Sequence, residues 1–202
     1  MVESFTCTSL EIIGLYRTNY LNKFHVREMA RLIKKSHVSL LPHLKSLEEK
    51  NILQVEFSGK NKSFSLNLDN KQGRDYISIA EKNISIKFLA KHFFIKKIYD
   101  ETASINPQGC LILFGSYASG TQTKESDIDV FYLGHSSQKL KDSIGQLKQL
   151  YVKNIHFTSM AFTEFRKGLQ SGFVKEVVNN HTLLYNHDMF INEIWRYYYE
   201  RK

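Results

Sequence analysis

The feature that most constrains the fold is an apolar run ending in glycine and serine, followed ten residues later by two aspartates in a second apolar run. The first run is Cys110–Phe114, and Gly115-Ser116 follows it directly. In the second run, Asp127 and Asp129 alternate with apolar residues. Strand side chains point alternately to two faces, so both carboxylates share one face while their neighbours enter a core. The sequence therefore predicts two strands of a sheet, a glycine bend and a paired-carboxylate edge.

This arrangement of residue types suits a bound nucleotide. Two carboxylates on one face repel each other unless a cation lies between them, and hard oxygen ligands suit Mg²⁺. Glycine lets a ligand approach the backbone closely. If a short helix begins after the first strand, its free N–H groups and the Ser116 hydroxyl can hold a phosphate oxygen. We therefore expect a magnesium–nucleoside triphosphate site; the alternative is an exposed strand end with carboxylates there by chance.

The spacing Gly-Ser-x10-Asp-x-Asp resembles the signature of minimal nucleotidyltransferases in the DNA polymerase β superfamily, over residues 85–185. The resemblance implies a mixed sheet with helices, a nucleoside triphosphate as donor, and transfer of a nucleotidyl group to an acceptor. With Mg²⁺ as cofactor, the leading expectation is transfer of AMP from ATP to a hydroxyl of a protein or other acceptor. The resemblance also implies that Gly115 and Ser116 bind the triphosphate and that Asp127 and Asp129 bind the metal. Similar proteins often act on a partner protein, as the antitoxin half of a toxin–antitoxin pair.

The next predicted strand departs from that family's pattern. The family commonly has a third carboxylate there, but residues 154–160 contain none. Alternation places His156 and Thr158 on the face of the aspartates. His156 is a candidate general base, and the alternative is a histidine that merely lies beside a polar site. Many relatives also have arginine where this chain has Ser119. Both differences leave open a domain that binds nucleotide without turnover.

The first 70 residues have a different pattern. Apolar spacing predicts a helix over 10–21, a second helix over 26–33 and a third from Ser39 to residue 50. Alternation over 53–57 and 64–68, with a turn at 59–62 between, predicts a β-hairpin. Three helices followed by a hairpin are typical of a winged helix-turn-helix domain, which we place at 1–70.

A winged helix suggests duplex DNA as a partner. The chain has 28 basic and 20 acidic residues, a formal net charge of +8, and residues 1–70 have ten basic and seven acidic residues. The polar residues expected on the third helix and at the hairpin tip are the candidate DNA contacts: Ser39, His43, Lys45, Lys60 and Lys62. The alternative is a winged helix used for dimerisation or partner docking, and a homodimer is a further expectation.

The rest of the chain predicts a connector and an α/β layer. A helix over 74–103 with a following link makes 71–108 a connector, and residues 109–202 alternate strands and helices. The predicted fold class is α+β, with an N-terminal winged helix-turn-helix and a C-terminal polymerase β-like domain. The leading function is a Mg²⁺-dependent nucleotidyltransferase fused to a DNA-binding domain. The rival is a winged-helix transcriptional regulator whose second domain only binds nucleotide or is inactive.

Composition excludes several other classes. Hydrophobic residues make up 42% of the chain and charged residues 24%, which is an ordinary globular balance. No apolar run approaches the length of a membrane span, and the first residues lack the pattern of a secretory signal. The two cysteines, Cys7 and Cys110, form neither a disulfide framework nor a zinc spacing. We therefore expect a cytoplasmic protein with no membrane partner.

Overall fold

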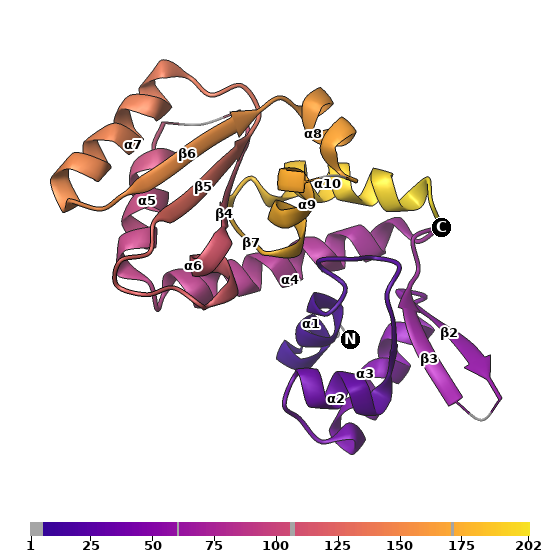
Figure 1. Ribbon diagram of the computed structural model, residues 1–202. Helices are drawn as coiled ribbons and strands as arrows, with labels where there is room; N and C mark the ends of the chain where they lie inside the picture. The colour runs from indigo at the N-terminus through magenta and orange to yellow at the C-terminus, as the bar shows by residue number, and fades with distance from the viewer. Residues whose placement is uncertain (1–5, 60, 106–107, 171) are drawn as a thin grey trace. The chain divides into compact units, whose positions relative to one another are not determined.

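The computed structural model describes residues 6–59, 61–105, 108–170 and 172–202 (Figure 1). The chain forms two compact units: the N-terminal unit comprises the residues up to Asn83 together with Ile194–Lys202, and the C-terminal unit comprises Ile84–Glu193. These bounds differ from the expected ranges 1–70, 71–108 and 109–202, because the last residues of the chain pack with the first unit. No helix in the described part of the chain is long and apolar enough to span a bilayer.

The N-terminal unit combines short helices with an antiparallel sheet. The strands lie in the order β1-β3-β2, and β3 pairs antiparallel with both neighbours. The elements, in chain order, are α1 (Cys7–Gly14), β1 (Lys23–His25), α2 (Val26–Leu32), α3 (His37–Glu49), β2 (Leu53–Ser58) and β3 (Asn61–Leu66). The hairpin and the three helices are confirmed, whereas β1 was not predicted because three residues carry too little periodicity.

Two helix limits differ from those predicted. Helix α1 ends at Gly14, and turns follow, so the predicted helix over 10–21 is wrong in its second half. Helix α3 begins three residues earlier than predicted, because Ser36 rather than Ser39 caps it: the Ser39 N–H donates to the Ser36 side chain at 3.2 Å. The hairpin loop is also shorter than predicted, since Asn61 pairs with Ser58.

The C-terminal residues complete the core of the N-terminal unit. The ring of Tyr20 lies 5.8 Å from that of Trp195 and 5.2 Å from that of Tyr198. Burial raises the pKa of the Tyr20 phenol well above its usual value. Arg17 donates two hydrogen bonds, of 2.9 and 3.0 Å, to the buried carboxylate of Glu81. These contacts explain why residues from Ile194 onward belong to this unit.

The C-terminal unit is a mixed sheet flanked by helices. The strands lie in the order β6-β5-β4-β7; β5 and β6 are parallel, and the other pairs are antiparallel. The elements that follow the hairpin are α4 (Lys71–Leu89), α5 (Phe93–Ala103), β4 (Cys110–Phe114), α6 (Gly115–Ser119), β5 (Ile128–Leu133), α7 (Gln138–Tyr151), β6 (Ile155–Met160), α8 (Phe162–Gly168), α9 (Gly172–Asn179), β7 (His181–Tyr185) and α10 (His187–Tyr199). The helix predicted over 74–103 is thus two helices, broken near residues 90–92.

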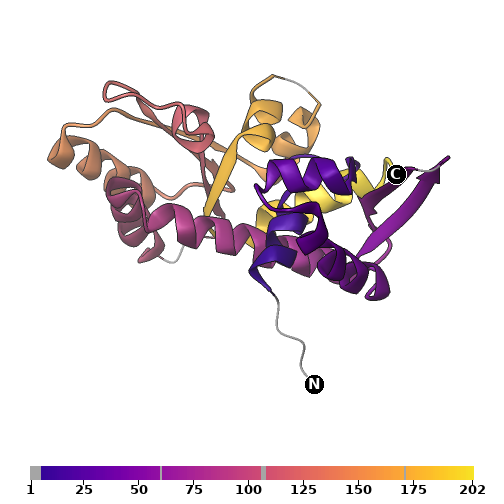
Figure 2. The same ribbon diagram turned by 90° about the horizontal axis from the view of Figure 1, so that it is seen from below.

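The sheet is covered on both faces. Helices α5 and α7 cover the face that carries Ile128, Val130 and Tyr132, and they lie on the same side of the sheet in both views (Figures 1 and 2). The opposite face packs through aromatic rings: the ring of Phe131 lies 6.0 Å from that of Phe165 in α8 and 5.4 Å from that of Phe173 in α9. Strand alternation in β5 therefore supplies both cores; the sequence pattern predicted the core that contains Ile128 and Val130, but not the aromatic core on the opposite face.

Val152 ends α7 in a strained conformation. Its φ is +52° and its ψ +38°, in the left-handed region that β-branched residues rarely adopt, and it is 91% exposed. We expect Val152→Asn to raise the free energy of unfolding by about 1 kcal/mol, because asparagine tolerates this region. Urea unfolding of the full chain measures the change. Val38→Asn, an exposed position inside α3, is the control and should not stabilise; equal effects at both positions would contradict the prediction.

Candidate active site

The glycine bend begins the site. Strand β4 ends at Phe114, and the short helix α6 starts at once with Gly115, whose φ is +68°. A Cβ at this position would collide with the Oδ2 atom of Asp129, so the backbone and the carboxylate meet with no room for a side chain. The Ser116 carbonyl accepts the Thr121 N–H at 3.0 Å, which closes the bend. Two independent features, the positive φ and the close approach, thus require glycine here.

The two aspartates lie where alternation placed them. Asp129 is opposite Phe114 of β4 and beside His156 of β6, and Asp127 immediately precedes β5. Ile128, between them, is fully buried. The side chains of Asp127 and Asp129 are 41% and 27% exposed, so both carboxylates reach solvent.

His156 lies between these carboxylates. Its Nε2 is 3.6 Å from Oδ2 of Asp127, and its Nδ1 is 3.4 Å from Oδ1 of Asp129. His156 and Thr158 are the two residues that alternation placed on the aspartates' face of this strand, and His156 is the one beside Asp129. Thr158 lies two residues further along β6, beside Phe131. The imidazole therefore bridges the two acids.

Asn154 is a member of the site that the sequence analysis missed. Its Nδ2 donates to Oδ1 of Asp127 at 2.7 Å and lies 3.2 Å from Nε2 of His156. The Ile128 N–H donates to the Asn154 carbonyl at 2.9 Å, which continues the parallel pairing of β5 and β6 and holds Asn154 beside Asp127. The parallel pairing of β5 with β6 would have indicated that Asn154 lies beside Asp127, but the sequence does not reveal whether two strands pair parallel or antiparallel.

The donor set fits Mg²⁺ carried by a nucleotide better than a metal held by protein alone. Among the described residues, no group of three or more histidine, cysteine or acidic side chains is arranged to hold a metal ion. Mg²⁺ needs fewer protein ligands than that, because it commonly takes one or two carboxylates and completes its shell with water and phosphate oxygens. Asp127 and Asp129 supply those carboxylates, and the nitrogen atoms of His156 are poorer ligands for this ion.

The residues predicted to contact DNA have partners within the N-terminal unit. His43 Nδ1 lies 3.0 Å from Thr6 Oγ1. Lys45 Nζ is 3.7 Å from a carboxylate oxygen of Glu49, and Lys62 donates to Glu48 at 2.9 Å. The Ser39 hydroxyl donates to the Ser36 carbonyl at 2.7 Å. Lys60 lies outside the described residues. Any DNA contact by these side chains would compete with these interactions.

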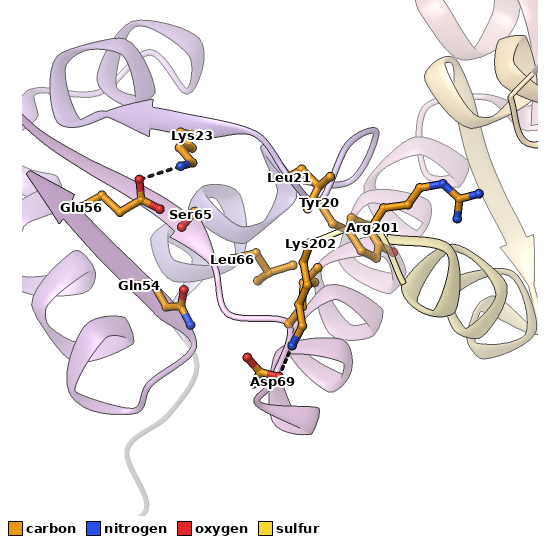
Figure 3. Close-up of a pocket in the computed structure, with 11 residues that line it drawn as sticks. Tyr20, Leu21, Lys23, Gln54, Glu56, Ser65, Leu66, Asp69, Arg201 and Lys202 are labelled. Carbon is orange, nitrogen blue, oxygen red and sulfur yellow. Dashed lines mark hydrogen bonds and ion pairs between the residues drawn. The ribbon is translucent and has the colours of Figure 1, made fainter. Parts of the chain in front are cut away.

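Two hollows lie elsewhere. One, of about 360 Å³, is in the N-terminal unit, where the ion pairs Lys23–Glu56 and Lys202–Asp69 line it (Figure 3). Another, also about 360 Å³, is lined by Gly134 and neighbouring residues at the far end of β5. Neither is lined by Asp127 or Asp129. The carboxylates of the candidate site lie apart from both hollows, at a solvent-exposed edge of the sheet.

Comparison with known families agrees with this geometry. Residues 86–190 match the family model described as polymerase beta, nucleotidyltransferase. The match covers more than half of the chain and includes the glycine bend, both aspartates and His156. The comparisons with curated proteins and with solved structures gave no match. The mixed sheet, the paired carboxylates and the family model together show that this chain belongs to the polymerase β nucleotidyltransferase family.

Proposed function

We propose that the chain is a Mg²⁺-dependent nucleotidyltransferase that uses ATP as donor and transfers AMP to a hydroxyl of a partner protein or other acceptor. The observation that carries the proposal is the approach of the Gly115 backbone to Asp129, with Asp127 on the same exposed edge, inside a domain of this family. Such an edge offers backbone groups to phosphates and carboxylates to a cation within one site.

The residues have distinct roles in this proposal. Gly115 leaves room for the triphosphate, and Ser116 contributes a hydroxyl and a backbone N–H to it. Asp127 and Asp129 would hold Mg²⁺, which supplies charge neutralisation at the phosphates when bound. Asn154 fixes the Asp127 carboxylate through its 2.7 Å hydrogen bond. His156, beside both carboxylates, would accept the proton of the acceptor hydroxyl.

The transfer step itself is a substitution at phosphorus. The acceptor oxygen forms a bond to the α-phosphorus, the bond from that phosphorus to the bridging oxygen breaks, and pyrophosphate leaves with the electron pair. The hydroxyl proton passes to His156 or to solvent. Catalysis of this kind depends on positioning and on electrostatic stabilisation rather than on a covalent enzyme intermediate.

The test uses the full chain and ATP labelled at the α- or the γ-phosphate. Label from the α-phosphate is expected to appear on an added cell extract or on the chain itself with Mg²⁺ and to disappear with EDTA, while label from the γ-phosphate should stay in pyrophosphate. Transfer of γ-label would identify a kinase instead. Absence of both transfer and Mg²⁺-dependent ATP binding by equilibrium dialysis would refute the proposal.

A second candidate is a transcriptional regulator whose nucleotidyltransferase domain binds nucleotide without turnover. The lack of any carboxylate in residues 154–160, where His156 lies beside the aspartates, supports it. So does the order α1-β1-α2-α3-β2-β3 of the N-terminal unit, which matches that of a winged helix. A salt-sensitive mobility shift of duplex DNA by the full chain, weakened by Lys45→Ala with Lys60→Ala and not by Lys139→Ala in α7, is expected if this unit binds DNA. No shift on any duplex at low salt would exclude it.

His156→Asp tests the metal site that both candidates share. A third carboxylate beside Asp127 and Asp129 adds repulsion without metal, so the melting temperature should fall in EDTA. Mg²⁺ with ATP should then raise it by more than in the wild type, because ligand binding stabilises the folded state. If turnover is limited by the missing carboxylate, the transfer rate should rise about tenfold or more. His156→Asn, which removes the ring without adding charge, is the control. An unchanged response to Mg²⁺ and ATP would contradict a metal site here.

A further inference from the structure

An exposed apolar patch lies at the ends of helices α5 and α7 in the C-terminal unit. We name it the α5–α7 patch: Phe93 at the start of α5, Leu150 and Tyr151 at the end of α7, and Val152 after it. Phe93 is 69% exposed and Leu150 74%. The rings of Phe94 and Tyr151 meet at 5.0 Å, so this contact brings the two helix ends together. Exposed apolar residues grouped in this way mark interaction sites more often than isolated ones do.

Strain points to the same patch. Val152 combines a left-handed backbone with almost complete exposure, so its side chain gains little from burial within the chain while the backbone conformation costs stability. Burial of this apolar side chain by a partner would offset the cost of the backbone conformation. Leu150, two residues earlier, is exposed on the same helix end.

Charge identifies the kind of partner. Between Glu81 and Asp100 the sequence has no acidic residue, and the part of this stretch in the C-terminal unit carries the lysines Lys87, Lys91, Lys96 and Lys97, of which Lys96 is ion-paired with Asp100. Between Asp142 and Glu164 there is again no acidic residue, and Lys148 and Lys153 flank the patch in sequence. The ammonium of Lys97 lies 5.6 Å from the centroid of the Phe93 ring. An apolar centre among lysines fits an acidic partner.

The observations favour an acidic protein over two other occupants. The two most exposed residues of the patch, Leu150 and Val152, are aliphatic and suit apolar side chains of a protein, since they offer neither stacking nor hydrogen bonds to a nucleic acid. Of its two rings, that of Tyr151 packs against Phe94, and that of Phe93 lies beside the Lys97 ammonium. A second copy of the chain, related by a twofold axis, would bring the same lysines face to face. An acidic segment with apolar anchors meets neither difficulty.

The patch is close to the site along the chain. Val152 precedes Asn154 by two residues, so their Cα atoms lie within about 7 Å of each other. Asn154 holds Asp127 through its amide, and Lys153 donates to the Lys124 carbonyl at 3.1 Å, in the loop that leads to Asp127. A partner seated on the patch would therefore have its neighbouring hydroxyls near the carboxylates.

We propose that the α5–α7 patch is the docking surface for the acceptor, an acidic protein segment with apolar anchors. This inference rests on the proposed function, because it assigns the acceptor class for the same site. It requires no change in how ATP and Mg²⁺ bind, since none of the patch residues touches the carboxylates in the contacts described above.

A peptide-binding experiment tests the docking surface. The probe is a fluorescein-labelled helical peptide with leucines at i, i+3, i+7 spacing and glutamates elsewhere, and its control has lysines in place of the glutamates. Fluorescence anisotropy with the full chain should show binding of the acidic peptide alone. Leu150→Ser with Val152→Asn should weaken it about tenfold or more. The matched control, Val38→Ser with Leu41→Ser, changes two exposed apolar residues of the N-terminal unit and should leave binding unchanged.

Every other outcome overturns the inference. These are no binding of the acidic peptide, equal binding by the patch variant, or equal binding of the lysine peptide. A labelled dT20 that loses affinity in the patch variant would show a nucleic-acid surface, and a dimer in sedimentation that dissociates in it would show self-association. The rise in melting temperature caused by Mg²⁺ with ATP, measured on the same proteins, tests the proposed function separately. If the wild type shows no rise, the proposed function is refuted. If it shows the rise but does not bind the peptide, only the docking surface is refuted.

Discussion

Replacing Asp127 and Asp129 together by asparagine is expected to abolish nucleotidyl transfer, with a loss of at least about 10³-fold in rate. Asparagine keeps the size of each side chain and still accepts the hydrogen bond from Asn154. What disappears is the negative charge that would hold Mg²⁺ at the phosphates. The initial rate of release of pyrophosphate from ATP, with Mg²⁺ in excess, measures the effect.

The same variant separates chemistry from folding. Removing two neighbouring negative charges relieves repulsion in the metal-free protein, so the melting temperature in EDTA should stay constant or rise. The stabilisation by Mg²⁺ with ATP should be lost. Asp100→Asn and Asp142→Asn are the matched controls, because these aspartates bind Lys96 and Gln138 on the surfaces of α5 and α7. Full activity in the double variant would place the metal elsewhere and remove the basis of the proposed function.

The strands of the site could be predicted because local pattern and burial agree there. The limits of β4 match the predicted run Cys110–Phe114, and β6 begins one residue into the predicted strand 154–160. The apolar patterns over 127–133 and 138–151 likewise predict a strand and a helix, and these are β5, which begins one residue later, and α7. Each of these elements carries one unbroken periodicity, of two in the strands or of about 3.6 in the helix. The alternation around Ile128 then determines that Asp127 and Asp129 share a face, without any knowledge of the neighbouring strands.

Properties that depend on distant residues could not be predicted. The helix predicted over 74–103 has apolar residues throughout, so its pattern did not show the break between α4 and α5. Trp195 was assigned to the C-terminal domain, yet it packs on Tyr20, far away in sequence. Lys62 was expected at an exposed tip, but it lies in β3, and its ammonium forms an ion pair with Glu48 of α3. Pairings between elements decide each of these cases.

The polar contacts of the site were also predictable only where they follow from local alternation. His156 was placed on the face of the aspartates by alternation, and the structure puts it beside Asp129. Its bridging position between both carboxylates, and the role of Asn154, required the parallel register of β5 and β6. Sequence patterns thus selected the residue types and the face, while register determined which side chains meet.

Gly115→Ala is expected to destabilise the protein more than Gly120→Ala, although both glycines have a left-handed backbone, with φ of +68° and +74°. The conformational cost of alanine in this region is about 1 kcal/mol at either position. At Gly120 nothing lies within 4 Å of the added Cβ, so this cost should be the whole effect. At Gly115 the Cβ meets Asp129, and displacing that carboxylate or the bend should bring the loss to about 3 kcal/mol.

The pair of variants also tests whether this bend serves the nucleotide. Urea unfolding gives the free energy of unfolding of each variant. Equilibrium dialysis with Mg²⁺ and ATP, without urea and at a temperature where each variant is folded, gives its affinity for ATP. Because a shifted Asp129 can no longer meet a cation at the same place, Gly115→Ala should weaken binding of ATP by at least about tenfold, while Gly120→Ala should change it little. Gly115→Ala with Asp129→Gly removes the colliding atoms, so it should recover stability but not affinity. Recovery of both would mean that Asp129 is needed for packing alone, and equal losses in the two single variants would mean that the close approach at Gly115 has no part in the site.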